Sequence, residues 1–370
     1  MAGTERLHYL DNLKVAAIAL VIAHHVGQAY GPTGGYWPIQ ELQRAALLGP
    51  FFTVNRSFGM SLFFMIAGYF TVMSFRSRGG RAFLKDRALR LGIPTFVFAL
   101  INIALRPYFS PTDVPRASLL PLEVGHLWFL EHLLIFSAGY VLWDSIRESL
   151  QWPKPAVTRP PGYVTIVIVA LALAAVTGVV RMWYPIDRWS YVFGFIRVMF
   201  ADVPRDLTFY IIGVMACDRR WFQGFATRDG YVWLAIGLAL AAFWYVNELS
   251  PWNLRRASPV TRDAVRLVWE VLLCFGMCIG LTVLFREKLN VRNQLSSALA
   301  QSQYAAYIFH PGFVLLFQAL VASLAWAPLA KFVVVTLAAV PASFVFGYWV
   351  AKPLRLQGAT GGAVGRTTTY

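Results

Sequence analysis

The stretch YLDNLKVAAIALVIAHHVGQAYG, from Tyr9 to Gly31, decides how this chain folds. From Val15 to Tyr30 it contains no acidic residue, no Lys and no Arg, yet His24 and His25 lie in the middle. An apolar run of this length is typical of a helix that crosses a membrane. Ionisable side chains inside such helices are rare and usually face a bundle interior or a wet cavity. The two histidines therefore indicate a functional site.

The spacing of the ionisable residues adds to this interpretation. Lys14 and His25 are eleven residues apart, which corresponds to about three helical turns and about 16 Å along the axis. One face of the helix therefore offers a cation at the membrane surface and an imidazole near the middle of the bilayer. His24 projects about 100° away from His25, so we expect it to have a packing or hydrogen-bonding role.

Composition identifies the class of protein. Hydrophobic residues make up 58% and charged residues 14% of the 370 residues, against about 45–50% and about 25% in soluble proteins. The chain is therefore predicted to be an integral membrane protein, and its net charge of +15 does not indicate nucleic-acid binding. We expect neither disulfides nor a metal site, because the cysteines lie in or beside apolar runs without metal-ligand spacing: Cys217, Cys274 and Cys278.

About ten apolar runs are long enough to cross a hydrocarbon core of about 30 Å. They are continuous rather than alternating, which predicts an all-α bundle and not a β-barrel. The sixth run is the weakest, because it is short and opens with two aspartates, a proline and an arginine; the run 191–200 before it is either part of it or a re-entrant piece. The runs are 14–31, 57–75, 90–107, 126–143, 163–183, 203–217, 231–247, 267–285, 304–324 and 331–351.

Basic residues predict the orientation of these spans. About 20 of the 33 Lys and Arg residues fall on the side of the N-terminus, which is the pattern of cytoplasmic loops. Both termini are therefore predicted to be cytoplasmic. Residues 1–356 are expected to form a single transmembrane domain, followed by a Gly- and Thr-rich tail, 357–370, that is predicted to be disordered.

Small residues mark places where helices can approach each other closely. Gly59 and Gly68 lie in the second run, where tight helix packing is the simplest interpretation. The eighth run has a face of small residues that packs either within one chain or between two: Cys274, Gly276, Cys278 and Gly280.

A dense basic segment precedes the third run. Six basic residues fall between Arg76 and Arg90, among them Lys85. Arg87 and Arg90 are one helical turn apart, so their guanidiniums can converge on a polyphosphate at the membrane surface. An acyl-coenzyme A suits such a site, because its phosphates stay in water while its thioester arm enters the bundle. Anionic lipid head groups would satisfy the same charges.

Two other runs carry ionisable or phenolic side chains. The segment GHLWFLEHLLIF opens the fourth run and contains His126, Glu131 and His132. A carboxylate at such a depth is expected to have a partner, either His132 or a cation of another span. In SQYAAYIFHPGF, a tyrosine, a second tyrosine and a histidine repeat at three-residue steps and share a helix face, and a proline follows that is expected to kink the helix: Tyr304, Tyr307, His310 and Pro311.

Together these segments resemble the acyltransferase-3 family of integral membrane proteins. The resemblance lies in the Lys14 and His25 pattern, LFFMIAG, RALRLGIP, HLWFL and QYAAYIFHP. YLDNLK with HLWFL is most similar to the branch of bacterial glucan-modifying succinyltransferases. The resemblance implies a ten-span bundle in the bacterial inner membrane. It would take an acyl group, acetyl or succinyl, from cytoplasmic acyl-CoA as co-substrate and deliver it to a hydroxyl of an extracytoplasmic glycan.

The resemblance also assigns roles to residues. His25 would be catalytic together with Lys14, either as a general base or as a nucleophile that forms an acyl-imidazole. Lys14 replaces the more common arginine, and Glu131 with His132 stand where apolar residues are usual, which suggests a different acceptor. The coenzyme would contact Arg87, Arg90, Lys85, Tyr307 and His310, and the acceptor side would include His126 and Glu131.

Two other classes of function fit parts of this sequence. A secondary transporter or lipid flippase could use buried His and Glu residues as a proton relay. Against it, the two halves of the chain show no repeat, and a transporter needs no dense arginine pair at one cytoplasmic mouth. A membrane-embedded sensor or scaffold would leave the histidines without a role.

Overall fold

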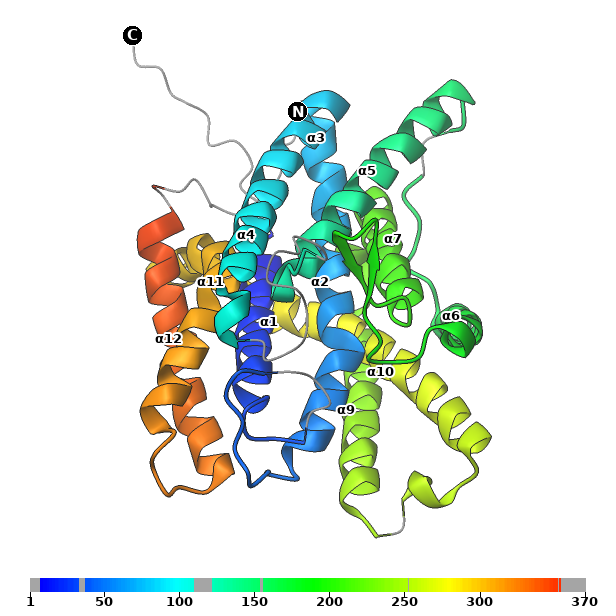
Figure 1. Cartoon of the computed structure of the whole chain (residues 1–370). Coiled ribbons are helices and arrows are strands. Elements are labelled where there is room, and N and C mark those ends of the chain that lie inside the picture. The colour runs from blue at the N-terminus through cyan, green and yellow to red at the C-terminus, as the bar shows by residue number, and fades with distance from the viewer. Residues whose placement is uncertain are drawn as a thin grey trace.

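The computed structural model describes residues 7–32, 37–109, 122–153, 156–251, 253–351 and 353. Within these ranges the chain is almost entirely helical (Figure 1). The first half contains α1 (His8–Gly27), α2 (Leu48–Arg78), α3 (Gly80–Arg87), a π-helical turn η1 (Ala88–Gly92), α4 (Ile93–Phe109), a 3-10 turn η2 (Gly125–Leu127), α5 (Trp128–Ser149) and α6 (Tyr163–Trp183). The second half contains β1 (Ser190–Val192), β2 (Ile196–Val198), α7 (Val203–Arg219), α8 (Trp221–Gly224), α9 (Thr227–Leu249), a 3-10 turn η3 (Leu254–Arg256), α10 (Pro259–Lys288), α11 (Gln294–Val321) and α12 (Pro328–Ala351).

The prediction of an all-α polytopic membrane protein is confirmed. Eight helical segments of the described chain are long and apolar enough to cross a membrane, one of them the continuous segment Gly80–Ala104 through α3, η1 and α4. They coincide with eight of the ten predicted runs. The fourth and sixth runs form α5 and α7, and α7 is 17 residues long. The cytoplasmic orientation of the termini stays a prediction, and the tail 357–370 lies outside the described residues.

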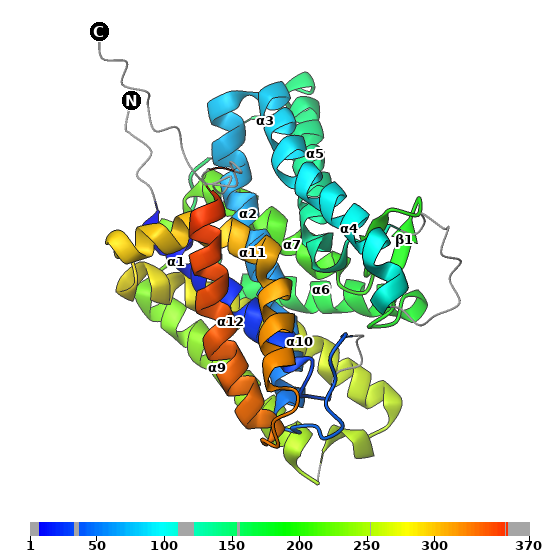
Figure 2. The same ribbon diagram turned by 60° about the vertical axis from the view of Figure 1, so that its left-hand side comes forward.

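Helix α2 runs through the middle of the molecule from one end to the other (Figure 1). Helix α1 packs beside it and also against α11 and α12, which form a closely packed pair on one side. Helices α9 and α10 form a second pair, and α7 packs along α2. Helices α3, α4 and α5 gather around the C-terminal end of α2, whereas α6 lies across the other helices (Figure 2).

Glycines allow two of these helix pairs to pack backbone against backbone. A Cβ atom on Gly68 of α2 would lie 2.1 Å from the carbonyl oxygen of Tyr210, and one on Gly213 of α7 would lie 1.9 Å from that of Met65. A Cβ atom on Gly276 of α10 would lie 2.8 Å from the backbone nitrogen of Gly237 of α9. Tight packing at Gly68 is therefore confirmed, and the small-residue face of α10 packs within the chain, against α9.

Buried ion pairs explain how α7 enters the bundle despite its polar start. Glu270 of α10 accepts two hydrogen bonds from Arg181 of α6, at 2.9 and 3.0 Å, and also pairs with Arg205 of α7. Asp202, which precedes α7, lies 3.2 Å from Arg181 and 3.1 Å from Arg56 of α2. Since each carboxylate faces at least one guanidinium, the charges are not left unpaired in the interior.

The run 191–200 forms neither part of α7 nor a spanning helix. Strands β1 and β2 pair antiparallel in this region, with Tyr191 opposite Arg197. The hairpin is joined to α5 through its backbone, because Arg197 N–H donates to the Glu131 carboxylate at 3.1 Å. His132 Nε2 in turn lies 3.2 Å from the Arg197 carbonyl oxygen.

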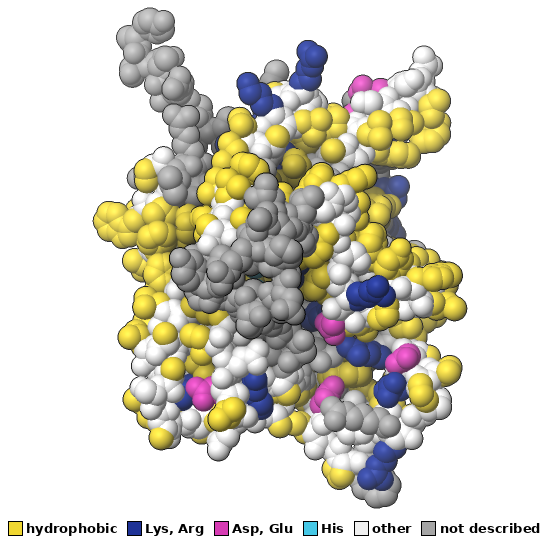
Figure 3. Space-filling model, viewed as in Figure 1, with side chains coloured by type: hydrophobic (Ala, Val, Ile, Leu, Met, Phe, Trp, Pro, Cys, Tyr) yellow, Lys and Arg dark blue, Asp and Glu magenta, His cyan; other side chains and the backbone are white. Residues whose placement is uncertain are grey.

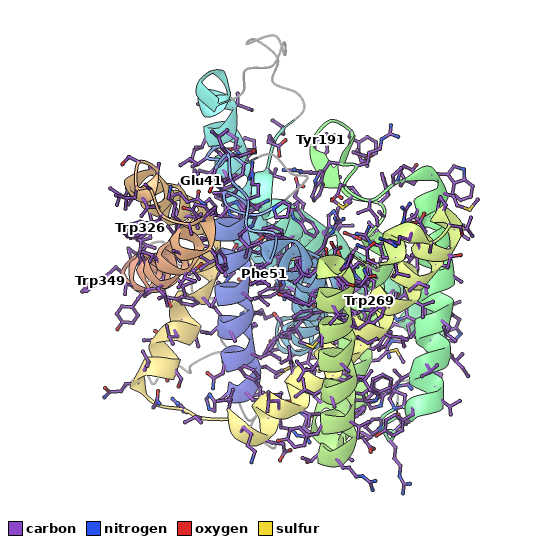
Figure 4. All side chains as sticks on the ribbon, turned by 90° about the horizontal axis from the view of Figure 1, so that it is seen from below. Glu41, Phe51, Tyr191, Trp269, Trp326 and Trp349 are labelled. Carbon is purple, nitrogen blue, oxygen red and sulfur yellow. The ribbon has the colours of Figure 1, made fainter. Side chains whose placement is uncertain are left out.

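The surface is that of a protein surrounded by lipid. Hydrophobic side chains cover much of the face shown in Figure 3, and two basic side chains lie at the end where α3 lies; most of the other charged side chains on this face lie in its lower half. Trp349 of α12 is 73% exposed and projects from the outer edge of the bundle (Figure 4). Exposed apolar side chains of this kind are expected where helices face hydrocarbon.

Candidate functional site

Three imidazoles from distant parts of the chain meet in one cluster. His25 comes from the last turn of α1, His126 from η2 and His310 from the middle of α11. The ring centroids are 5.2 Å apart for His25 and His310, 4.9 Å for His126 and His310, and 6.5 Å for His25 and His126. The cluster thus unites a residue predicted to be catalytic, one predicted on the acceptor side and one predicted on the coenzyme side.

Hydrogen bonds to acceptor oxygens set the tautomer of each ring. His25 Nδ1 lies 2.6 Å from the side-chain oxygen of Gln28, His310 Nδ1 lies 2.7 Å from the Tyr307 carbonyl, and His126 Nε2 lies 3.1 Å from the Ile308 carbonyl. Amide and peptide oxygens only accept hydrogen bonds, so in each ring this nitrogen carries the proton. The second nitrogen of each neutral ring therefore keeps a lone pair.

Pro311 explains why a carbonyl is available to His310. In a regular α-helix the N–H of residue 311 would donate to the carbonyl of Tyr307, but proline has no N–H. His310 Nδ1 takes the place of that donor. The opposite nitrogen, Nε2, is buried and has no hydrogen-bond partner among the described residues. Because His310 is completely buried, a base with an open lone pair is held in the interior of the bundle.

Polar and aromatic side chains that the sequence analysis did not select hold the cluster in place. Trp37 stacks on His25 with a centroid distance of 5.5 Å, and its indole N–H donates to the Gln318 side-chain oxygen at 2.7 Å. The Gln318 amide donates to the Val26 carbonyl at 3.0 Å, which ties α11 to α1. The sequence signal that could have identified two of these residues is a single amide side chain in an apolar run: Gln28 in the run 14–31 and Gln318 in the run 304–324.

Tyr307 and His24 lie next to the cluster and contact other parts of the bundle. The Tyr307 hydroxyl donates to the His126 carbonyl oxygen at 2.5 Å, so it supports the loop that carries His126. His24 faces α2, where its Nδ1 lies 3.2 Å from the Asn55 amide nitrogen and its ring packs edge-on against Phe52. The prediction of a packing or hydrogen-bonding role for His24 is confirmed.

Lys14 belongs to a different environment. Its Nζ atom lies 2.9 Å from an Asp11 carboxylate oxygen and 4.7 Å from the centre of the Phe70 ring. Three helical turns, about 16 Å along α1, separate it from His25. The structure therefore places Lys14 in an ion pair at the other end of α1 and not at the imidazole cluster.

The predicted coenzyme-binding cations lie in three different environments. Arg87 is 3% exposed, with its guanidinium 5.1 Å from the Phe83 ring, and its Nε has no hydrogen-bond partner among the described residues. Arg90 pairs with Asp86 at 2.8 Å and is half-buried. Lys85 is exposed. These residues therefore form a series from the surface to the interior.

Tyr304 connects this basic segment to the helix that carries His310. Its hydroxyl donates to the Arg90 carbonyl oxygen in the π-helical turn η1. Regular α-helical hydrogen bonding is interrupted in such a turn, which makes a carbonyl available for an outside donor. Tyr304, Tyr307 and His310 therefore lie on the face of α11 that contacts both groups of residues.

Glu131 lies outside the imidazole cluster. Its carboxylate accepts the backbone N–H of Arg197, as described above, while the Arg197 side chain pairs with Glu123 and stacks on Trp189 at 4.2 Å. The partner of Glu131 is thus a backbone group of the β-hairpin and not His132, which contacts the Arg197 carbonyl oxygen instead. Its role on the acceptor side stays a prediction.

The chain is similar to known proteins over much of its length. Residues 7–348 match the acyltransferase domain model of the acyltransferase-3 family. The chain is similar to glucans biosynthesis protein C of Salmonella schwarzengrund strain CVM19633 and of Salmonella heidelberg strain SL476, each 26% identical over 230 residues that cover 57% of this chain and 58% of the relative. It thus spans less than two thirds of these relatives. No solved structure matches the chain.

Proposed function

The chain belongs to the acyltransferase-3 family and is an integral membrane acyltransferase; from this we propose that it moves an acetyl or succinyl group from cytoplasmic acyl-CoA to a hydroxyl of an extracytoplasmic glycan. We place it in the bacterial inner membrane. The names of the relatives, which concern glucan biosynthesis, support a glycan acceptor. The observation that carries the proposal is the imidazole cluster, which holds three ring lone pairs inside the bundle.

Arg87 supports the choice of a polyanionic donor. A buried charge is normally paired or hydrogen-bonded, because its removal from water costs several kcal/mol. This cost is similar in size to the free energy of unfolding of a whole domain. Among the described residues no carboxylate pairs with Arg87. A phosphate of the coenzyme would supply the missing charge. Arg90 and Lys85, nearer the surface, suit the other phosphates of the same ligand.

His25 suits the role of general base. Gln28 holds the proton on Nδ1, so Nε2 can accept the proton of the acceptor hydroxyl. The hydroxyl oxygen then forms a bond to the thioester carbonyl carbon, the carbon–sulfur bond breaks, and the imidazolium returns the proton to the coenzyme A thiolate. His310, with its buried lone pair 5.2 Å away between ring centres, is placed to accept a hydrogen bond from a second hydroxyl of the acceptor.

A covalent route uses the same geometry. His25 Nε2 would attack the thioester carbon, the carbon–sulfur bond would break and coenzyme A would leave, which gives an acyl-imidazole. The acceptor hydroxyl oxygen would then take the acyl group, and its proton would pass to the released imidazole. The two routes differ in one observable. The covalent route acylates the protein in the absence of acceptor, in a burst that His25→Ala removes, whereas general-base catalysis gives no burst.

Acyl transfer by the purified protein tests the proposal. Wild type, His25→Ala and His24→Ala are supplied with acetyl-CoA or succinyl-CoA and a glycan, and free coenzyme A and acylated glycan are measured. His24→Ala is the matched control, because its ring is next to His25 in the sequence but faces Asn55 of α2. We expect wild type and the control to form acylated glycan and His25→Ala to fold without turnover. Equal transfer by His25→Ala would refute the role of this residue.

The transporter alternative predicts a different result in the same assay. A transporter with a histidine relay releases no coenzyme A from any acyl donor and is not stabilised by coenzyme A, since only ligands of the native state raise its stability. Membership of an acyltransferase family favours the enzyme.

A further inference from the structure

A cavity lies away from the imidazole cluster and the basic segment. It has a volume of about 520 Å³ and lies between α6, α7 and α10, with α8 at one end. This volume is within the range of about 300–1,000 Å³ that small-molecule sites occupy. None of the residues to which a role in acyl transfer is assigned above lines it.

The body of the cavity is apolar and reaches the outside of the bundle. Its walls include Ile166, Val169, Phe209, Ile212, Phe275 and Ile279. Val169 of α6 and Ile211 of α7 line the cavity and are nevertheless 39% and 47% exposed, so the cavity opens between these helices. The outer face of α6 is apolar, with Val164 and Ile168 more than half exposed. In a bilayer this opening faces lipid chains.

One end of the cavity carries positive charge. Arg159 and Arg219 line it there, beside Thr158 and Trp221, and the lining contains no acidic residue among those described. The Arg219 guanidinium lies 5.4 Å from the Trp221 ring, and its Nε is buried without a hydrogen-bond partner in the described part of the chain. Trp221 N–H donates to the Thr158 hydroxyl at 3.3 Å, which joins the two sides of this end.

The apolar body and the positive end together define the chemistry of a ligand that would fill the cavity. An apolar body of this size that opens to lipid suits a hydrocarbon chain, and two guanidiniums at one end suit a phosphate. The positive end lies on the side that Lys and Arg counts predict to be cytoplasmic, where anionic lipids attract basic residues. A soluble anion would use only the arginines and leave the apolar walls without a ligand.

We propose that this cavity binds an anionic phospholipid, with one acyl chain between α6, α7 and α10 and its phosphate at Arg159 and Arg219. The lipid closes the gap between α6 and α7 and stabilises their packing. This site is separate from the acyl-transfer site, and the proposal does not depend on the identity of donor or acceptor.

Lipid binding to the full chain in detergent tests the proposal. The protein is delipidated and titrated with phosphatidylglycerol, phosphatidylethanolamine or inorganic phosphate, while native mass spectrometry counts bound lipid and the thermal midpoint is recorded. We expect one phosphatidylglycerol to bind saturably and to raise the midpoint. Phosphatidylethanolamine should bind more weakly, and phosphate alone should have no effect at the same concentration.

Two pairs of variants locate the site. Val169→Trp fills the cavity from its open side, whereas Ile168→Trp adds the same ring to the adjacent position of α6, which does not line the cavity. Arg159→Gln with Arg219→Gln should weaken phosphatidylglycerol binding by about 30-fold, since each basic residue near a lipid surface contributes about fivefold. The control pair Arg228→Gln with Lys288→Gln removes two exposed charges outside the cavity and should bind as wild type.

Several results would overturn the proposal. They are equal binding of the two lipids by wild type, equal stabilisation by phosphate, or unchanged lipid binding in both Val169→Trp and the arginine pair. The arginine pair keeps the test decisive if Val169→Trp does not fold, because Arg159 is exposed and Arg219 is half-buried near the end of α7.

Discussion

Replacing Arg87 by methionine should stabilise the ligand-free protein. The guanidinium is 3% exposed and its described contact is the Phe83 ring. A buried ion without a partner loses several kcal/mol of hydration, and a desolvated cation–π contact returns about 2 kcal/mol. Because apolar replacement of buried ionic groups stabilises proteins by about 1–4 kcal/mol, we expect a gain near the lower end, about 1–2 kcal/mol.

The same substitution should weaken coenzyme binding. Removal of one partner of a desolvated charge pair costs about 2 kcal/mol or more, which is about 30-fold in Kd. The assay is the thermal midpoint of the purified protein, recorded without ligand and across a coenzyme A titration. The midpoint of Arg87→Met should start above that of the wild type and rise less with coenzyme A.

Arg81→Met is the matched control for this experiment. Arg81 lies in the same helix, α3, but its side chain is exposed. Its removal should leave both the ligand-free midpoint and the response to coenzyme A close to those of the wild type. If Arg87→Met instead is less stable than the wild type and binds coenzyme A equally well, then the guanidinium is a structural group. In that case the donor site must be sought elsewhere.

Three further substitutions test the site and the fold. Pro311→Ala restores an N–H that competes with His310 for the Tyr307 carbonyl, so we expect a higher thermal midpoint. We also expect kcat to fall by about fivefold, the equivalent of one hydrogen bond of about 1 kcal/mol. An unchanged kcat would contradict the role of this carbonyl. Glu131→Gln keeps an acceptor oxygen for the hairpin, so stability and acyl transfer should stay near wild type, and loss of transfer alone would place Glu131 at the acceptor. Gly213→Ala forces α7 away from α2 and should destabilise the protein by about 1–3 kcal/mol, measured against Gly139→Ala, where an added Cβ meets nothing within 4 Å.

The sequence was sufficient to predict the helices and the packing glycine of α2. Continuous apolar runs have one stable arrangement in lipid, so each run became a helix. Gly68 could be recognised because small residues in such a helix permit close approach, and its partner Gly213 lies in the run that looked weakest. That run looked weak because Asp202, Arg205 and Asp206 are counted as polar. Asp202 and Arg205 pair with charged residues of α2, α6 and α10, and Asp206 accepts a hydrogen bond from Ser61 of α2. These contacts are a tertiary property that no local pattern contains.

The sequence identified the histidines of the site but not their arrangement. Each of His25, His126 and His310 was noticeable as an ionisable residue in or beside an apolar run. Their contact depends on how α1, η2 and α11 pack, and sequence distance gives no information on that. Because the three histidines lie in separate spans, the sequence predicted a catalytic role for His25, the acceptor side for His126 and the coenzyme side for His310. Gln28 and Gln318 were missed because a neutral amide costs less to bury than a charge, and so stands out less.

Helix α11 links the two parts of the proposed reaction site. Tyr304 donates to the carbonyl of Arg90 in η1, and three residues later Tyr307 donates to the carbonyl of His126. His310 follows after three more residues and contacts His25 and His126. One helical face, set by a repeat of three residues, therefore touches the basic segment at one end and carries His310 against the other two imidazoles at its other end. A ligand held at Arg87 and Arg90 would rest against this face, so its thioester arm would be directed along α11 toward His25, which is the geometry that acyl transfer through the bundle requires.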